Sequence, residues 1–171
     1  MRKTLNYGMV GASLSSFIGV VHRIGIGFDG RAKLAAGCFS TNEKKNRETA
    51  EFFELDQDRV YATYEEMAEK EGKREDKIDF VVISAPNNVH YQTAKAFLEN
   101  GIHVLCEKPL CFEVEQGEEL KKLAEEKGLL FCVNYSYSGN NMVKEARELI
   151  RSGKIGRITF EWPEEEDGKE A

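Results

Sequence analysis

The stretch IDFVVISAP, residues 78–86, is the clearest strand signal in the chain. It is apolar on both faces and rich in β-branched residues, and Pro86 ends it. A strand that is apolar on both faces is typical of a parallel sheet with helices on both sides, because antiparallel strands usually keep one polar face. The stretch therefore predicts an α/β protein.

Strand-like runs alternate with helical patterns along the chain, without internal repeats. Thr63 and Glu66 form a capping box, and Asn100-Gly101 and Gly128 are C-cap signals. Right-handed crossovers between such strands give a doubly wound parallel sheet. The predicted strands are 4–11, 33–40, 78–86, 103–109 and 129–135, and the predicted helices are 17–28, 42–54, 64–71, 89–99, 113–127 and 142–150.

The end of the chain has a different pattern. RITFEW, residues 157–162, alternates apolar and polar residues, as a half-buried antiparallel strand does. The sequence that follows is a solvated acidic tail. We therefore expect residues 1–156 to form the parallel-sheet domain, and residues 157–171 to supply one strand of a second layer plus the tail. An uncovered strand at 158–162 would also be an edge for self-association.

The bulk composition excludes several classes of partner. The chain has 171 residues, of which 41% are hydrophobic and 32% charged, as in a soluble globular domain. No apolar run is long enough for a membrane span or a signal peptide. The net charge of −6 argues against nucleic acid, although local backbone donors could still hold a small anionic cofactor. We expect a cytoplasmic protein.

Four cysteines, Cys38, Cys106, Cys111 and Cys132, are present, and none forms a CxxC pair. Three of them, all except Cys111, lie inside strand-like apolar runs. We interpret them as buried reduced thiols, with metal or redox chemistry as the alternative. No metal site is predicted.

The loop after the first strand, in MVGASLSSFIGVVHR (9–23), has the position of a dinucleotide loop. Such a loop needs a tight turn, close approach of the backbone to pyrophosphate, and close packing of the helix on the strand. Gly11 can supply the turn, Ser13 lies where the backbone would approach the pyrophosphate, and Ser16 is small enough for the helix to pack on the strand. The start of the helix offers free N–H groups to an anion. A plain strand–helix turn is the alternative.

The second strand ends at Ser40, without an acidic residue that would bind ribose hydroxyls and mark NAD. Lys44, Lys45 and Arg47 follow, which permits the 2′-phosphate of NADP. A solvated basic helix face is the alternative interpretation.

Two later strands also end in polar residues. SAPNNVH (84–90) places Asn87 and His90 after one strand, where a turn with an N-cap asparagine is the alternative. HVLCEKP (103–109) ends in Glu107 and Lys108. A lysine there can polarise a hydroxyl substrate and a glutamate can orient the lysine, whereas a surface ion pair is the alternative.

With these segments in this order, the chain resembles the N-terminal half of the Gfo/Idh/MocA (glucose–fructose oxidoreductase/inositol dehydrogenase) family. The resemblance covers the chain to about Trp162 and rests on the first loop, SAPNNVH, HVLCEKPL and RSGKIGRI. It implies a Rossmann-like domain that binds NAD or NADP, in an oxidoreductase acting on a CH–OH group of a sugar or polyol.

The resemblance also implies site residues. Lys108 and His90 are the expected catalytic residues. The expected cofactor-binding residues are Gly11, Ala12, Ser13, Ser16, Phe17, Ser40, Ala85, Pro86, Asn87, His90, Glu107 and Lys108.

This sequence departs from the family pattern in having fewer glycines in its first loop, and we expect the family's second domain to be absent apart from one strand. We therefore expect the chain to be inactive or weak by itself, since that domain supplies the acid–base group and most of the sugar pocket. A non-catalytic module that binds a dinucleotide or a protein partner is the alternative, as is a remnant that binds nothing.

Overall fold

The computed structural model describes residues 3–159 of the chain. The chain divides into two compact units, one ending at Asn134 and the other beginning at Tyr135. The first unit contains the sheet and the crevice at its edge.

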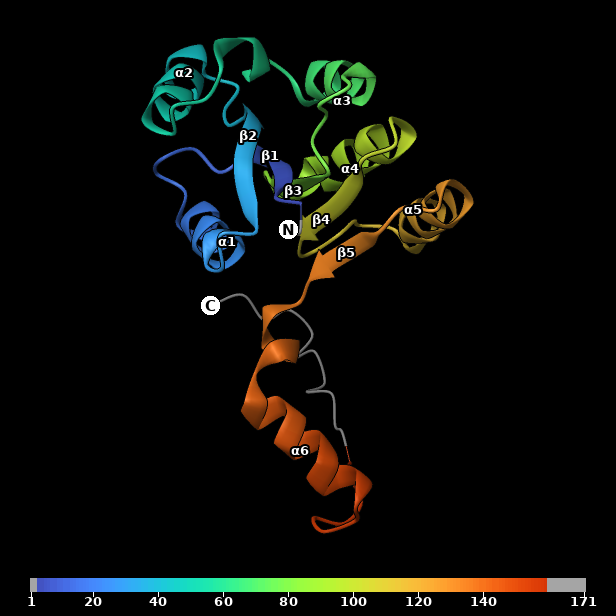
Figure 1. The fold of residues 1–171 in the computed structure, drawn as a ribbon. Coiled ribbons are helices and arrows are strands. Elements are labelled where there is room, and N and C mark those ends of the chain that lie inside the picture. The colour runs from blue at the N-terminus through green and yellow to red at the C-terminus, as the bar shows by residue number, and fades with distance from the viewer. Residues whose placement is uncertain (1–2, 160–171) are drawn as a thin grey trace, which may run out of the picture. The chain divides into compact units, whose positions relative to one another are not determined.

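The first unit is built on a five-stranded parallel sheet in the order β2-β1-β3-β4-β5 (Figure 1). This order places the later strands on one side of β1 and β2 on the other, which is the doubly wound arrangement predicted from the sequence. The strands are β1 (Leu5–Gly11), β2 (Ala32–Cys38), β3 (Phe80–Ser84), β4 (His103–Glu107) and β5 (Phe131–Asn134).

Helices connect the strands and begin and end close to the predicted boundaries. Thr63 Oγ1 accepts a hydrogen bond from the N–H of Glu66, and Gly101 and Gly128 end their helices with φ values of 71° and 63°. These caps were predicted from sequence. The helices of the first unit are α1 (Phe17–Gly27), α2 (Glu43–Phe52), α3 (Tyr64–Lys73), α4 (His90–Glu99) and α5 (Val114–Lys127), with short 3-10 turns at Gln57–Arg59 and Asn87–Val89.

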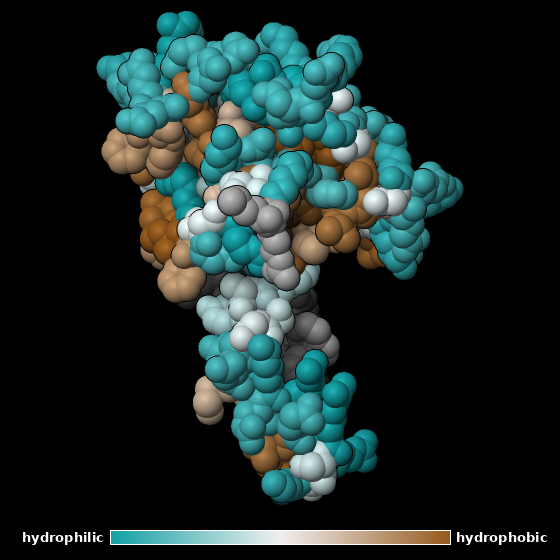
Figure 2. Space-filling model, in the orientation of Figure 1, coloured by the Kyte–Doolittle hydropathy of each residue, from teal (hydrophilic) through white to brown (hydrophobic). Residues whose placement is uncertain are grey.

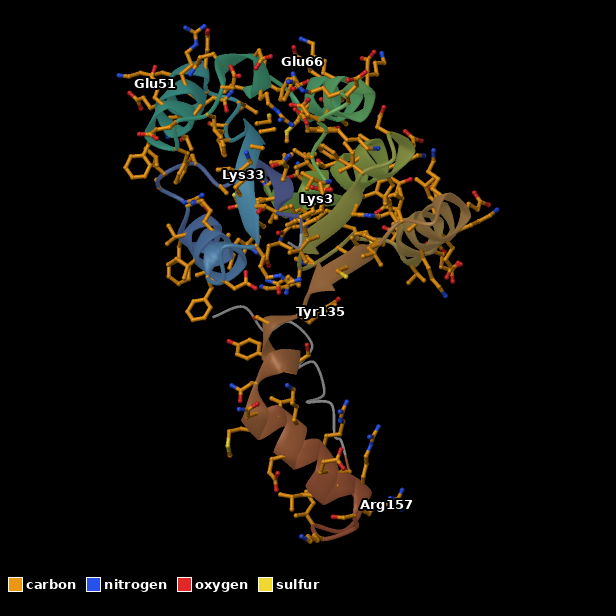
Figure 3. The ribbon with its side chains drawn as sticks, in the orientation of Figure 1. Lys3, Lys33, Glu51, Glu66, Tyr135 and Arg157 are labelled. Atoms are coloured by element: carbon orange, nitrogen blue, oxygen red, sulfur yellow. The ribbon has the colours of Figure 1, made fainter. Side chains whose placement is uncertain are left out.

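The two faces of the sheet bury separate cores. Val81, Ile83 and Cys106 pack with α3, α4 and α5 on one face, while Met9 and Val82 belong to the core on the other face, toward α1 and α2. Successive residues of β3 are thus buried on opposite faces of the sheet, as expected for a strand that is apolar on both faces. Charged side chains lie on the outside, as Figure 3 shows for Glu51 on α2 and Glu66 on α3.

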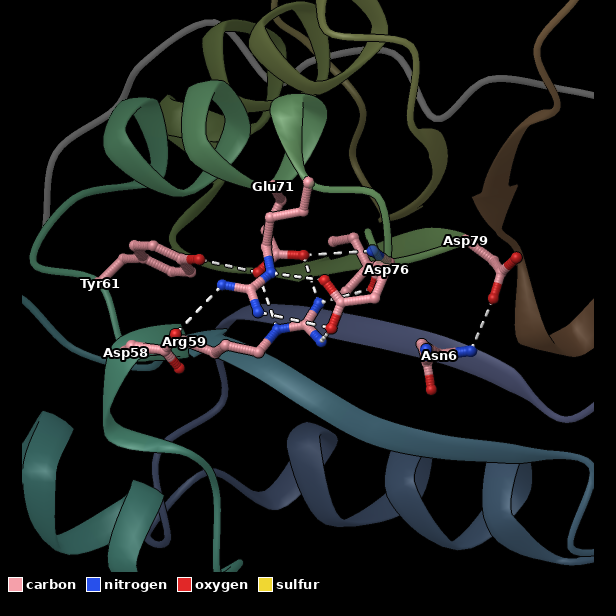
Figure 4. Close-up of polar contacts among 9 residues, drawn as sticks. Asn6, Asp58, Arg59, Tyr61, Glu71, Asp76 and Asp79 are labelled. Atoms are coloured by element: carbon pink, nitrogen blue, oxygen red, sulfur yellow. Dashed lines mark hydrogen bonds and ion pairs between the residues drawn. The ribbon is translucent and has the colours of Figure 1, made fainter.

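A buried ionic network, which we call the Arg59 cluster (Arg59, Tyr61, Glu71 and Asp76), fastens α3 to the sheet (Figure 4). Glu71 is fully buried and accepts two hydrogen bonds from the Arg59 guanidinium, at 3.0 and 2.5 Å. Its carboxylate also accepts from the Tyr61 hydroxyl at 2.7 Å and the N–H of Ile78 at 3.1 Å. The buried Glu71 carboxylate and the Arg59 guanidinium therefore each have several hydrogen-bond partners, which offset the cost of removing their charges from water.

Two surface features differ from what the sequence pattern indicates. The apolar stripe that marks α1 is largely exposed, with Phe17 83% and Phe28 87% accessible, and Figure 2 shows hydrophobic surface on the side of α1 and α2. Cys132, predicted to be buried, is exposed. Cys132 lies on the edge strand β5, in register with Leu105 of β4, and on the sheet face turned away from α4 and α5. An edge position with little cover explains its exposure.

The second unit contains a 3-10 turn, Ser136–Gly139, and helix α6 (Asn141–Arg151), which ends at Ser152 and Gly153 as predicted. Ile158 and Thr159 are not in a strand, and the rest of the strand predicted at 158–162 lies outside the described residues. Among residues 3–159, no helix is long and apolar enough to cross a membrane.

Candidate functional site

A cleft of about 560 Å³ lies at the carboxyl edge of the sheet in the first unit. The loops after β1, β2 and β3 form its sides, and the start of α3 closes it. This is where ligands of doubly wound sheets bind, and the volume is within the range of small-molecule pockets. The lining residues are Val10, Gly11, Ala12, Ser13, Ser16, Cys38, Phe39, Ser40, Thr41, Ala62, Thr63, Tyr64, Glu65, Ser84, Ala85, Pro86, Asn88 and Val89.

The loop after β1 makes a tight, strained turn at the cleft. Gly11 has a φ of 76°, and a Cβ on it would lie 2.6 Å from the carbonyl oxygen of Ser84. Only glycine satisfies both conditions, so Gly11 supplies the turn predicted for it. Ala12 also has a positive φ, of 62°, which is uncommon for a residue with a side chain. Such strain is often found at ligand-binding loops.

The close packing of α1 depends on Gly19, and this corrects the role given to Ser16. A Cβ on Gly19 would lie 2.5 Å from Ala12 Cβ, so only glycine fits where α1 crosses the loop. Ser16 is instead the N-cap of α1, because its hydroxyl accepts a hydrogen bond from the N–H of Gly19 at 3.1 Å. The sequence interpretation failed because it placed the packing position three residues too early.

Unpartnered polar groups at the cleft fit a polar, anionic ligand. The N–H groups of Phe17 and Ile18, in the first turn of α1, have no acceptor within residues 3–159. Helix starts of this kind bind phosphate through free N–H groups and the helix dipole. The buried Ser84 hydroxyl, on the cleft wall, also has no partner among the described residues. A buried hydroxyl is rarely left unpaired, so a ligand group is a natural partner.

The wall formed by β2 and α3 is neutral or acidic. Ser40, Thr41 and Glu65 all line it. Burial acts to raise the pKa of Glu65, but hydrogen bonds from its own N–H and from Tyr64 and Thr63 hold that pKa below its usual value. Arg47 lines an adjoining hollow of about 520 Å³, where Glu43 pairs with it at 2.6 Å. This pairing supports the solvated-face interpretation of the basic residues after β2.

His90 lies behind the cleft and has both ring nitrogens engaged. Its Nδ1 is 2.7 Å from the carbonyl oxygen of Pro109 and its Nε2 is 2.8 Å from that of Ala85, and the side chain is buried. Two carbonyl acceptors require protons on both ring nitrogens for both contacts to be hydrogen bonds. His90 therefore joins the β3 and β4 loops and does not line the cleft, which gives no support to the catalytic role expected from the resemblance.

Glu107 and Lys108 point in different directions at the end of β4. The Glu107 carboxylate is buried against His22 of α1 and Asn134 of β5, at 2.8 and 2.5 Å. Lys108 is exposed, and among the described residues its ammonium has no ion-pair partner. Glu107 therefore does not orient the lysine through a side-chain ion pair. The Lys108–Pro109 peptide bond is cis.

The structure brings together part of the predicted site. The predicted residues that line the cleft are Gly11, Ala12, Ser13, Ser16, Ser40, Ala85 and Pro86. Those that do not line it are Phe17, Asn87, His90, Glu107 and Lys108. The sequence interpretation missed Glu65, although the capping box at Thr63 could have indicated it, because helices of a doubly wound sheet start at the carboxyl edge. It also missed the contact of His22 with Glu107.

Comparison with known families and proteins agrees with this geometry. A family model described as an oxidoreductase family with an NAD-binding Rossmann fold, GFO_IDH_MocA, matches residues 5–135. An uncharacterized oxidoreductase of Bacillus subtilis, YfiI, is 42% identical over 157 residues, which are 91% of this chain and 40% of that protein. A scyllo-inositol 2-dehydrogenase (NADP(+)) of the same organism, IolW, is 35% identical over 81 residues, 47% of this chain and 22% of that protein.

A solved structure is similar over nearly the whole chain. The inositol dehydrogenase homolog of Azotobacter vinelandii, crystallised with NADH and myo-inositol, is 35% identical with a TM-score of 0.86. The match covers 92% of this chain and 42% of that one. The chain therefore spans less than half the length of these relatives.

Proposed function

The chain belongs to the Gfo/Idh/MocA family of oxidoreductases with an NAD-binding Rossmann fold, and we propose that its cleft binds a nicotinamide dinucleotide for the oxidation of a CH–OH group of a sugar or polyol. The observation that carries the proposal is the cleft itself. The turn at Gly11 and Ala12 and the N-cap Ser16 of α1 line it, together with Ser84, whose buried hydroxyl has no hydrogen-bond partner among residues 3–159.

Each wall of the cleft has a part in binding. The backbone of Gly11–Ser16 and the first turn of α1 hold the pyrophosphate, because free N–H groups and the helix dipole both favour an anion. Ser40 and Thr41, at the end of β2, hydrogen-bond the adenosine ribose. Ser84 and Ala85 approach the nicotinamide half from the end of β3.

Lys108 acts on the substrate. A bound nicotinamide dinucleotide would supply the hydride chemistry for interconversion of a hydroxyl and a carbonyl on the substrate carbon. The exposed ammonium of Lys108 would donate a hydrogen bond to the substrate oxygen and stabilise negative charge that develops on it. The complex of the Azotobacter vinelandii relative with myo-inositol supports a polyol as the substrate class.

The acidic wall favours NAD over NADP. Glu65 lines the cleft beside Ser40 and Thr41, and Arg47 in the adjoining hollow is already paired with Glu43. A 2′-phosphate at this end would meet the Glu65 carboxylate, and the Arg47 guanidinium of the adjoining hollow is already neutralised by Glu43. The family also contains a relative named for NADP(+), so this choice depends on the residues of this chain.

A non-catalytic dinucleotide-binding module is the second candidate. The engagement of both ring nitrogens of His90 by backbone carbonyls favours it, because a side chain held in this way is not free to act on a substrate as the expected catalytic residue would. Product formation from a panel of polyols with bound cofactor separates the two candidates.

A titration of the chain with NADH and NADPH, followed by nicotinamide fluorescence, tests the proposal. We expect saturable binding below millimolar concentration, with NADH tighter than NADPH and the difference reduced in Glu65→Gln. Absence of binding of either dinucleotide at millimolar concentration would refute a cofactor role for the cleft. A preference for NADPH would refute the role given to Glu65.

A further inference from the structure

A buried carboxylate links three elements at the carboxyl edge of the sheet. Glu107 Oε1 lies 2.8 Å from His22 Nε2 and accepts a hydrogen bond from Asn134 Nδ2 at 2.5 Å. Glu107 Oε2 accepts from the N–H of Lys108 at 3.2 Å. We call His22, Glu107 and Asn134 the Glu107 cluster. Since His22 lies on α1, Glu107 on β4 and Asn134 on β5, one side chain joins all three elements.

The cluster holds a charge that would otherwise be costly to bury. Burial acts to raise the pKa of Glu107, but hydrogen bonds from Asn134, His22 and the Lys108 N–H outweigh it and keep that pKa below its usual value. The carboxylate is therefore an ionised acceptor, and hydrogen bonds to a charged acceptor are stronger than neutral ones. Loss of either donor would leave that buried charge with fewer partners.

The link connects the two parts of the site that a dinucleotide has to span. The first turn of α1 borders the cleft near the pyrophosphate position, and His22 lies on the next turns of the same helix. Lys108 directly follows Glu107, where β4 ends. The hydrogen bond between His22 and Glu107 thus runs directly from the helix that carries the loop to the strand that carries the lysine.

We propose that His22 and Asn134 are positioning residues, which act through Glu107 to set the distance between the dinucleotide loop and Lys108. This inference rests on the proposed function, because it assigns the Lys108 turn to the nicotinamide end of the cofactor. Small displacements of a positioned group strongly lower ligand affinity and reaction rate. Loss of a buried hydrogen bond that fixes such a group should therefore weaken binding.

Comparison of a whole cofactor with a fragment tests the proposal. NADH reaches both ends of the site, whereas ADP-ribose reaches only the loop end, so the ratio of their dissociation constants reports the nicotinamide end, to which the Lys108 turn is assigned. In His22→Leu and Glu107→Gln we expect NADH binding to weaken roughly tenfold, with ADP-ribose within about twofold of wild type. His22→Gln, which can place an amide donor near the Nε2 position, should restore most of the NADH affinity.

His103 provides a matched control on the same strand. It lies at the opposite end of β4, where its Nδ1 accepts a hydrogen bond from the N–H of Leu130 at 3.0 Å. His103→Leu should leave the affinities for both ligands unchanged. Circular dichroism and urea unfolding establish that each variant is folded, and Asn134→Ala replaces any variant that is not.

Each outcome separates this inference from the proposed function. Equal weakening of NADH and ADP-ribose in His22→Leu, or no weakening of either, would overturn the positioning role. Failure of His22→Gln to recover affinity would also count against it. If wild-type protein binds neither ligand, the proposed function itself fails, and the positioning role fails with it.

Discussion

The Arg59 cluster and the Glu107 cluster are both built around a buried glutamate, yet they differ in what surrounds them. Glu71 is enclosed by donors from Arg59, Tyr61 and Ile78, and it fastens α3 to the sheet. Glu107 also has several donors, but the next residue along the chain, Lys108, is exposed at the end of β4.

The difference shows that a buried charge does not by itself mark a functional site. Neither cluster lines the cleft. The Arg59 cluster links α3 to the residues just before β3, where Glu71 accepts a hydrogen bond from the N–H of Ile78. The Glu107 cluster lies at the carboxyl ends of β4 and β5, where doubly wound sheets bind their ligands. From this difference in position along the strands, we expect the Arg59 cluster to affect stability and the Glu107 cluster to have the positioning role proposed above.

The largest effect is expected from removal of the guanidinium in the Arg59 cluster. Arg59→Ala leaves the fully buried Glu71 without its cation, and we expect a loss of about 3–5 kcal/mol in the free energy of unfolding. Urea unfolding measures it. Arg74→Ala is the control, because Arg74 pairs with Asp76 and Asp58 near the surface and should cost at most about 1 kcal/mol.

The same variant tests the comparison of the two clusters. Under conditions where Arg59→Ala is folded, its dissociation constant for NADH should equal that of wild type. A loss of NADH affinity in the folded variant would show that the two clusters do not have separate roles.

Smaller changes in the free energy of unfolding are expected on α1, where an alanine should destabilise the fold at Gly19 and stabilise it at Gly25. Gly19→Ala places a Cβ against Ala12, and we expect a loss of about 1–3 kcal/mol with weaker NADH binding, because the loop must shift. Gly25→Ala, on the same helix with open space around it, should instead stabilise by about 0.5–1 kcal/mol through helix propensity. Thermal unfolding of both variants measures the pair, and equal effects would contradict the packing role of Gly19.

The smallest effect is expected at Asp79, next to the start of β3. Asp79 accepts hydrogen bonds from the N–H of Asn6 at 2.7 Å and from Lys3 at 2.8 Å. Although burial acts to raise the pKa of Asp79, these bonds hold it below its usual value. Because the pKa of Asp79 is lower in the folded state, Asp79 stabilises the fold at pH values above its unfolded-state pKa of about 3.9. This contribution is lost as the pH falls through the folded-state pKa.

Asp79→Asn should therefore lower the free energy of unfolding by about 1 kcal/mol at pH 7, and by less below about pH 4. Urea unfolding at several pH values measures the change. Lys3→Met is the comparison variant, because it removes only the exposed partner and leaves the bond from the Asn6 N–H, so it should cost less at pH 7 than Asp79→Asn does. A difference between wild type and Asp79→Asn that stays constant down to pH 3 would contradict the lowered pKa.

The sequence predicted the strands, the caps and the loop at Gly11, because each depends on local periodicity or on one residue's backbone freedom. It did not predict the contact of His22 with Glu107, which joins residues 85 positions apart and depends on how α1 lies across the sheet. A single histidine on a helix has no local signal that separates such a contact from ordinary core packing. Gly19 was missed for a similar reason, since its role comes from its approach to Ala12.

The role of the cleft is tested most directly by the backbone amide chemical shifts of the chain on titration with NADH. We predict that the amides of Ser13, Phe17 and Ala85 shift progressively and saturate, while those of Arg59 and Glu71 stay unchanged. Shifts confined to residues away from the cleft, or no shifts at millimolar NADH, would contradict the proposal that this cleft binds a nicotinamide dinucleotide.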